Sequence, residues 1–320
     1  MTIRNPPCAL AAFVFAFAAL LLGACGEQAT TSTSPTTAPV TPGRDRPEDP
    51  QASRSLLTPE DRRQLERFTA DAPGRVGIAV AALGAGEVTA LGGARTGRAW
   101  STMKVPLLVA LLDRLGGRRR LSESERSRAE AALTASDNEA ALALFDRLQR
   151  LEGGLVPASR AIEAVLRRSG DSGTKVNTEP SPEGFSTFGQ TIWSAKASTL
   201  FVRALAGGCL LSPGDTDYVL SLMERVVPGQ RWGLGAAGSP DGASIAFKGG
   251  WGPEPEGGYL VRQSGTVTGK GAGYALSVIA VPDETGSESF AAGQELTSSA
   301  ARLVGEKVAT GRPAAVTCQR

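Results

Sequence analysis

Three short polar motifs lie where the sequence predicts a boundary between a loop and a helix or strand. Residues 101–104 (STMK) precede the apolar run VPLLVALL, residues 136–138 (SDN) lie just before AALALF, and residues 248–251 (KGGW) follow SIAF. Because residues three apart share one face of a helix, the Lys104 amine can reach the Ser101 hydroxyl. Ser101 is therefore a candidate nucleophile with a lysine within reach, although Ser-x-x-Lys alone is a weak signal.

Each motif also has a purely structural interpretation. Ser101 can be a helix N-cap followed by a surface lysine, residues 136–138 are all of types that suit an N-cap, and Lys248 can simply end a strand. The order of the three motifs, and the elements on which they fall, are more specific than any one of them.

The composition removes most other kinds of catalytic site. The 320 residues include no histidine, which excludes Ser-His-Asp and Cys-His arrangements and histidine-based zinc sites. None of the four cysteines belongs to a Cys-x-x-Cys pair, so we expect no metal and no cofactor. A formal net charge of +2, with residues 118–120 (RRR) as the notable basic run, does not suit a nucleic-acid partner.

The remaining sequence predicts the elements that must position these motifs. A helix begins at the N-cap Thr58, and a mostly helical stretch covers residues 102–226. Strands are expected at 76–83, 87–91, 244–249, 258–268 and 273–282, and a last helix at 288–309. This order predicts an α+β fold in which an antiparallel sheet is flanked by helices and the inserted helical block forms its own lobe. A ligand site is expected in the cleft between the lobes.

In these motifs the chain resembles the class A β-lactamases and penicillin-binding proteins. That family carries S-x-x-K on a helix, S-D-N in a loop of the helical lobe and K-T-G on a sheet strand. The resemblance covers roughly residues 58–310 and is clearest around STMKVPLLVALL, LTASDNEAALALF and FKGGWG. The first two motifs are closer together than in class A enzymes, which indicates a trimmed helical lobe. The chain is also similar to actinobacterial β-lactamase-like lipoproteins in which K-x-G-W replaces K-T-G.

The resemblance implies a catalytic role for several residues. Ser101 would attack the carbonyl of a β-lactam and become acylated, and Lys104 would accept its proton. Lys104 must then be neutral near pH 7, and the positive charge of Lys248 would help to lower its pKa. Ser136 would pass a proton to the leaving nitrogen.

The same resemblance implies a set of substrate-binding residues. Asn138 would orient the lysine and the substrate amide, and Lys248, Gly250 and Trp251 would line the site. The backbone N–H groups of Ser101 and Trp251 would form the oxyanion hole.

Two departures from the family pattern bear on activity. Gly249 stands where K-T-G has a hydroxyl that contacts the substrate carboxylate, and the loss of one such charge-assisted hydrogen bond costs about 1.5–3 kcal/mol. The deacylating glutamate of class A enzymes lies in W-E-P-x-L-N, which makes Glu179 in TEP the candidate base. Glu183 replaces the asparagine of that motif, and Glu179 has an alternative interpretation as an exposed loop acid.

The N-terminal region predicts export and lipidation. Arg4 precedes an uncharged apolar run at residues 9–23 that is too short to span a membrane comfortably, and LGAC at 22–25 resembles the lipobox that is cleaved before a lipidated cysteine, here Cys25. An ordinary secretory signal is the alternative. We expect a cell-envelope protein that is anchored to the outer face of the membrane. The expected organisation is a signal peptide at 1–24, a flexible tether at 25–57, the hydrolase domain at 58–311 and a tail at 312–320.

Cys209 and Cys318 remain once Cys25 and the signal peptide are set aside, and in an oxidising envelope they are candidates for a disulfide. Sequence spacing does not establish that they are close in space. Trp193, Trp232 and Phe201 are expected to be packing residues.

Three functions are compatible with these observations. The leading hypothesis is a serine hydrolase that opens β-lactam amides through an acyl-Ser101 intermediate. The second is a peptidase of the same fold that acts on D-Ala-D-Ala wall peptides and stays acylated by penicillin. The third is an inactive, lipid-anchored binding protein, for which Gly249 and the trimmed lobe argue. We expect a monomer in each case.

Overall fold

The computed structural model describes residues 56–84, 86–238, 243–255, 257–269, 273–308 and 318. The expected signal peptide, Cys25 and nearly all of the expected tether lie outside these residues. Within the described ranges, no helix is long and apolar enough to cross a membrane.

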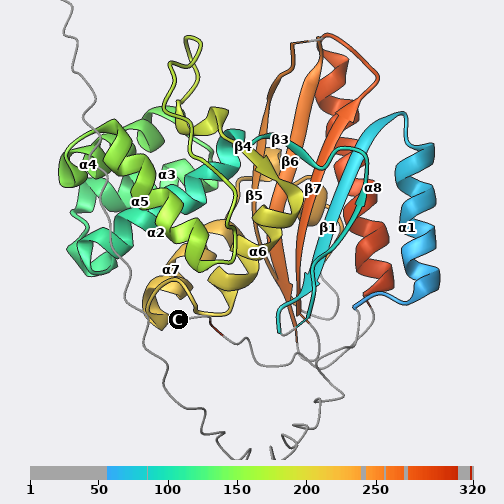
Figure 1. The fold of residues 1–320 in the computed structure, drawn as a ribbon, viewed down its shortest axis with the longest axis horizontal. Coiled ribbons are helices and arrows are strands. Elements are labelled where there is room, and N and C mark those ends of the chain that lie inside the picture. Colours follow the sequence, from blue (N-terminus) through green and yellow to red (C-terminus); the bar gives the residue numbers. More distant parts are fainter. Residues whose placement is uncertain are drawn as a thin grey trace, which may run out of the picture. The chain divides into compact units, whose positions relative to one another are not determined.

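A five-stranded antiparallel sheet forms the centre of the fold, with the strand order β2-β1-β7-β6-β5 (Figure 1). All five of its strands begin within two residues of the predicted start. Strand β5, however, continues to Pro253, four residues past its predicted end, so that residues 248–251 lie within it. Strand β5 is an edge strand, since it pairs with β6 alone. The bounds are β1 (Gly74–Ala82), β2 (Thr89–Gly92), β5 (Ser244–Pro253), β6 (Tyr259–Thr268) and β7 (Gly273–Pro282).

Helices cover both faces of this sheet. Helices α1 (Pro59–Asp71) and α8 (Glu288–Lys307) pack on one face, where they bury Val76, Ile78 and Val80 of β1 (Figure 1). Helix α6 (Ala195–Ala206) packs on the other face. Burial on both faces explains why the central strands β1 and β7 are apolar almost throughout.

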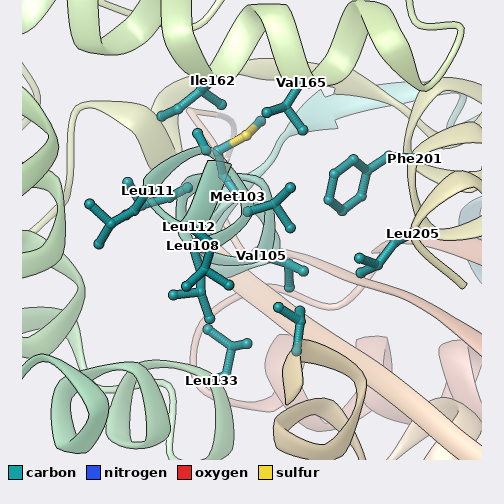
Figure 2. Packing of buried hydrophobic residues seen from close by; sticks show 14 of the residues in the cluster. Met103, Val105, Leu108, Leu111, Leu112, Leu133, Ile162, Val165, Phe201 and Leu205 are labelled. Carbon is teal, nitrogen blue, oxygen red and sulfur yellow. The ribbon is translucent and has the colours of Figure 1, made fainter. Parts of the chain in front are cut away.

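The inserted helical block forms a lobe around helix α2 (Lys104–Leu115). The helix buries residues on every side except at its C-terminal end, which accounts for its nearly continuous apolar sequence. Figure 2 shows side chains of α2 surrounded by Leu133, Ile162, Val165, Phe201 and Leu205 from neighbouring helices. The other helices of the lobe are α3 (Glu123–Thr134), α4 (Asn138–Glu152), α5 (Leu155–Arg168) and α7 (Pro213–Glu224).

A second, two-stranded antiparallel sheet has one strand inside the region that the sequence predicts to be mostly helical. Strand β3 (Thr96–Arg98) pairs with β4 (Ile192–Ser194), and the two join segments almost a hundred residues apart. Buried Arg262 of β6 holds this small sheet because its guanidinium donates to the backbone oxygens of Gly97, Arg98 and Trp193. Local sequence patterns do not predict a contact between residues so far apart in the sequence.

Cys209 and Cys318 form a disulfide, which answers the question that their spacing left open. Their Cα atoms are 5.2 Å apart, and the bridge joins residues separated by 109 positions. The expected packing residues Trp193, Trp232 and Phe201 are buried as well.

The three glycines of the KGGWG segment in β5 each lie closely against another part of the protein. A β-carbon at Gly249 would lie 2.8 Å from the indole of Trp232, and one at Gly252 would lie 2.3 Å from the indole of Trp100. At Gly250 it would lie 3.0 Å from the backbone nitrogen of Ser101. The glycines therefore allow the edge strand to approach Ser101 and two tryptophan rings closely.

We expect that Gly249→Thr, which restores the family hydroxyl, will lower the free energy of unfolding by about 1–3 kcal/mol, because the indole of Trp232 occupies the space of the new side chain. Combined with Trp232→Leu, the same change should cost less than it does alone. Urea denaturation of the four proteins measures this coupling. Gly93→Thr is the matched control, because a β-carbon at Gly93 has no neighbour within 4 Å. Equal costs of Gly249→Thr in the two backgrounds would contradict the prediction.

Candidate functional site

Ser101 lies in the 3-10 turn η1 (Trp100–Met103), immediately before α2. The hydroxyl is half-buried and borders a pocket of about 140 Å³. The pocket brings together residues from three predicted motifs, and its lining is Trp100, Ser101, Ser136, Asn138, Phe185, Ser186 and Trp251. The placement agrees with the expected cleft, since η1 also packs against β5.

Lys104, the first residue of α2, is buried with 2% of its surface exposed. Its Nζ donates to the backbone oxygen of Ser136 at 2.6 Å, to that of Asp137 at 3.1 Å and to Asn138 Oδ1 at 2.8 Å. Burial lowers the pKa of Lys104 to about 7, against an opposing effect of the Asp137 carboxylate. A substantial fraction of the amine is therefore neutral at neutral pH, as a proton acceptor requires.

Lys248 reaches the same place from the sheet. Its side chain is 1% exposed, and its Nζ donates to Ser136 Oγ at 2.8 Å and to the backbone oxygen of Gly249 at 2.9 Å. Burial and the nearby Lys104 lower the pKa of Lys248 well below its usual value. Since Lys104 Nζ lies 3.5 Å from Ser136 Oγ, the two amines share one hydroxyl.

The SDN segment serves both of the purposes that its sequence allows. Asp137 is the N-cap of α4 and accepts a hydrogen bond from the backbone nitrogen of Ala140 at 2.7 Å. Ser136, with a positive φ of 60°, and Asn138 direct polar atoms to Lys104 on either side of this cap. The structural and the functional interpretation are therefore compatible.

The expected oxyanion hole is consistent with the path of β5. The edge strand passes Ser101 so closely that a β-carbon at position 250 would lie 3.0 Å from the Ser101 backbone nitrogen, and Trp251 lines the pocket. An edge strand has backbone groups that no neighbouring strand pairs, so it can offer an N–H group to an oxyanion. The roles of Gly250 and Trp251 in substrate binding stay predictions.

Glu179, the predicted deacylation base, does not border the Ser101 pocket. The residue is exposed and lines a separate cavity of about 850 Å³, together with Asn177, Gln190 and Lys196 among others. The loop instead brings Phe185 and Ser186 to the pocket. Among the described residues that line the pocket there is no carboxylate.

Trp100, Phe185 and Ser186 line the pocket, although the sequence did not predict a site role for them. Trp100 directly precedes the candidate nucleophile and has a positive φ of 48°, an unusual conformation for a bulky residue. Phe185 is one of two phenylalanines in the predicted break at 170–190, and nothing in its surroundings in the sequence marks it as a pocket residue.

The fold is similar to those of several solved proteins. A solved class A β-lactamase from Mycobacterium abscessus is 20% identical, with a TM-score of 0.60 over 77% of this chain and 98% of that chain. PBP-A is 23% identical, with a TM-score of 0.58 over 78% of this chain and 98% of its own. A PBP-A variant described as an acyl-enzyme complex with penicillin G is 24% identical, with a TM-score of 0.58 over 77% and 95% of the two chains. No protein of curated function matches the sequence.

These likenesses show that the α+β fold is that of class A β-lactamases, as predicted. The family model described as the β-lactamase enzyme family matches residues 61–131 and 124–308, which is most of the chain. Its matched region includes all three motifs. The chain therefore belongs to the β-lactamase enzyme family.

Proposed function

We propose that this protein opens β-lactam amides through an acyl-Ser101 intermediate and releases the acyl group slowly. The observation that carries the proposal is the convergence of two buried amines, Lys104 and Lys248, on Ser136 Oγ beside the Ser101 pocket. A surface lysine or a simple helix cap would not require that both amines be buried.

The geometry supports a balanced path for one proton. Neutral Lys104 accepts the proton of Ser101 as Oγ bonds to the carbonyl carbon. The lactam C–N bond then breaks, and the leaving nitrogen receives a proton from Ser136 Oγ. Lys104, 3.5 Å away, returns a proton to Ser136, so the amine ends the acylation step as neutral as it began. Lys248 holds the Ser136 hydroxyl in place.

Deacylation has no carboxylate base among the described residues that line the Ser101 pocket. Hydrolysis of the ester needs a water molecule and a base, and Glu179 lines a different cavity. Gly249 supplies no hydroxyl for the substrate carboxylate, and Trp232 fills the space that such a side chain would need. The same observations favour, as a second candidate, a wall peptidase that recognises D-Ala-D-Ala and is trapped by penicillin.

The test is intact-mass analysis after incubation with penicillin G. We expect an adduct on the unmodified protein with the mass of the whole antibiotic, and none on Ser101→Ala. Glu179→Gln should leave the adduct lifetime unchanged, because this carboxylate does not border the pocket. If Glu179→Gln prolongs the lifetime about 10²-fold or more, then Glu179 is the general base after all.

The remaining outcomes separate the alternatives. An adduct that does not decay, together with cleavage of a D-Ala-D-Ala peptide, would favour the peptidase. If no adduct forms and no penicillin is consumed over long incubation, the enzyme hypothesis is wrong and the binding-protein hypothesis replaces it.

The acylation rate should rise with pH through about 7. Lys104 is protonated below its lowered pKa and cannot accept the Ser101 proton, whereas above it the neutral amine dominates. For a pKa of about 7, the neutral fraction increases about tenfold between pH 6 and pH 8. Stopped-time mass spectrometry at several pH values measures the rate, with circular dichroism to verify folding. A rate that is constant or falls over this range would refute Lys104 as the base.

We further propose that the protein is exported and anchored to the outer face of the cell membrane through lipidated Cys25. The LGAC segment and the polar region after it support this location. Cys25→Ser should move the protein from the membrane pellet to the soluble fraction after carbonate washing, and metabolic labelling with a fatty acid should disappear. Retention of the variant in the pellet would count against the anchor.

A further inference from the structure

The Ser101 pocket is small for the ligands that the proposed function requires. Its volume is about 140 Å³, whereas sites for drug-sized molecules usually measure roughly 300–1,000 Å³. Three of its seven lining residues are aromatic: Trp100, Phe185 and Trp251. A β-lactam with a bulky side chain therefore needs one of these walls to move.

Two of the aromatic walls are fixed by the body of the protein. Trp100 is 6% exposed, and its indole packs directly on Gly252 of β5. Trp251 belongs to β5, which pairs with β6 along its whole length, and its ring contacts Phe290 of α8 at 5.1 Å between centroids. Displacing either ring would disturb the edge of the sheet.

Phe185, unlike the other two aromatic residues, lies in a loop and is partly exposed to solvent. Its side chain is 36% exposed, and its ring contacts Trp100 at 5.2 Å between centroids. The segment that carries it bonds mainly to itself, since the Phe185 backbone nitrogen donates to the Pro182 oxygen and the Ser181 hydroxyl donates to the Phe185 oxygen. Gly184, with a φ of +83°, supplies the turn.

The side chain of Asn177 links the two ends of this segment by hydrogen bonds. Asn177 Nδ2 donates to the backbone oxygens of Glu179 at 2.8 Å and of Thr187 at 3.3 Å. The backbone nitrogen of Asn177 in turn donates to Thr191 Oγ1 at 3.0 Å. Residues 180–186 are thus a turn that is tied to the protein at its base and rests on Trp100 through one exposed ring.

We propose that Phe185 is the movable cover of the Ser101 pocket and determines which substrates acylate Ser101. Compact β-lactams enter beneath the ring, whereas those with bulky side chains must first separate it from Trp100. This inference rests on the proposed acylation of Ser101 and adds a specificity residue to it. Asn177 acts as a positioning residue, because it sets where the turn lies.

The test compares acylation rates with a compact probe, 6-aminopenicillanic acid, and a bulky one, a dye-linked penicillin. Phe185→Ala should raise the ratio of the bulky to the compact rate constant about tenfold, which corresponds to the loss of one aromatic contact. Asn177→Ala should shift the ratio in the same direction. Ile192→Ala is the matched control, since Ile192 is apolar and 57% exposed but lines the other cavity.

A second measurement does not depend on β-lactam chemistry. In Ser101→Cys protein, the thiol at position 101 is modified with methyl methanethiosulfonate or with a dye-linked maleimide, and peptide mapping follows that position. Adding Phe185→Ala should accelerate the large reagent about tenfold and change the small one little.

The outcomes of the two measurements are distinguishable. An equal effect of Phe185→Ala on large and small probes, or no effect, would overturn the cover. If no protein forms a β-lactam adduct while the thiol experiment shows size selectivity, the proposed function fails and the cover stands.

Discussion

Two lysine amines are buried against a single serine hydroxyl, and the arrangement of the lobes depends on this contact. An amine taken out of water must keep its hydrogen-bond partners or give up its charge. Lys104 donates to three oxygen acceptors in the turn at residues 136–138. Lys248 donates to Ser136 Oγ and to the backbone oxygen of Gly249. Within the part of the chain that the structure describes, neither amine has a salt-bridge partner. The positions of these acceptor oxygens are therefore essential to the burial of the two amines.

The same contact joins elements that are far apart in the sequence. Lys104 opens the central helix of the helical lobe, the 136–138 turn opens the next helix of the site, and Lys248 lies on the edge strand of the sheet. A shift of either lobe would separate an amine from its acceptors. The glycines of β5 complete this constraint, since they let the strand pass against the backbone of Ser101 and against two indole rings.

Much of this architecture was predictable because it depends on local patterns. The STMK and SDN motifs lie next to the helices expected of them, and the apolar strands β1 and β7 and the central helix reflect burial on more than one side. The KGGW motif was expected where a strand ends, but it lies within β5. The long-range parts were not predictable. Whether Glu179 or Phe185 faces Ser101 depends on how the 170–190 loop is braced, by the Arg167 guanidinium bonded to the Asp171 and Thr174 oxygens, for example. The role of Trp232 beside Gly249 likewise requires the folded contact.

Two residues of the described chain other than glycine, Trp100 and Ser136, hold a positive φ, and both border the Ser101 pocket. Each such conformation costs roughly 1–3 kcal/mol, which surrounding contacts must offset. Glycine at either position would relax the backbone and would also remove a pocket wall or the shared hydroxyl. Directed evolution for thermal stability alone would therefore favour substitutions that damage this site. An attempt to stabilise the protein should leave Trp100 and Ser136 unchanged.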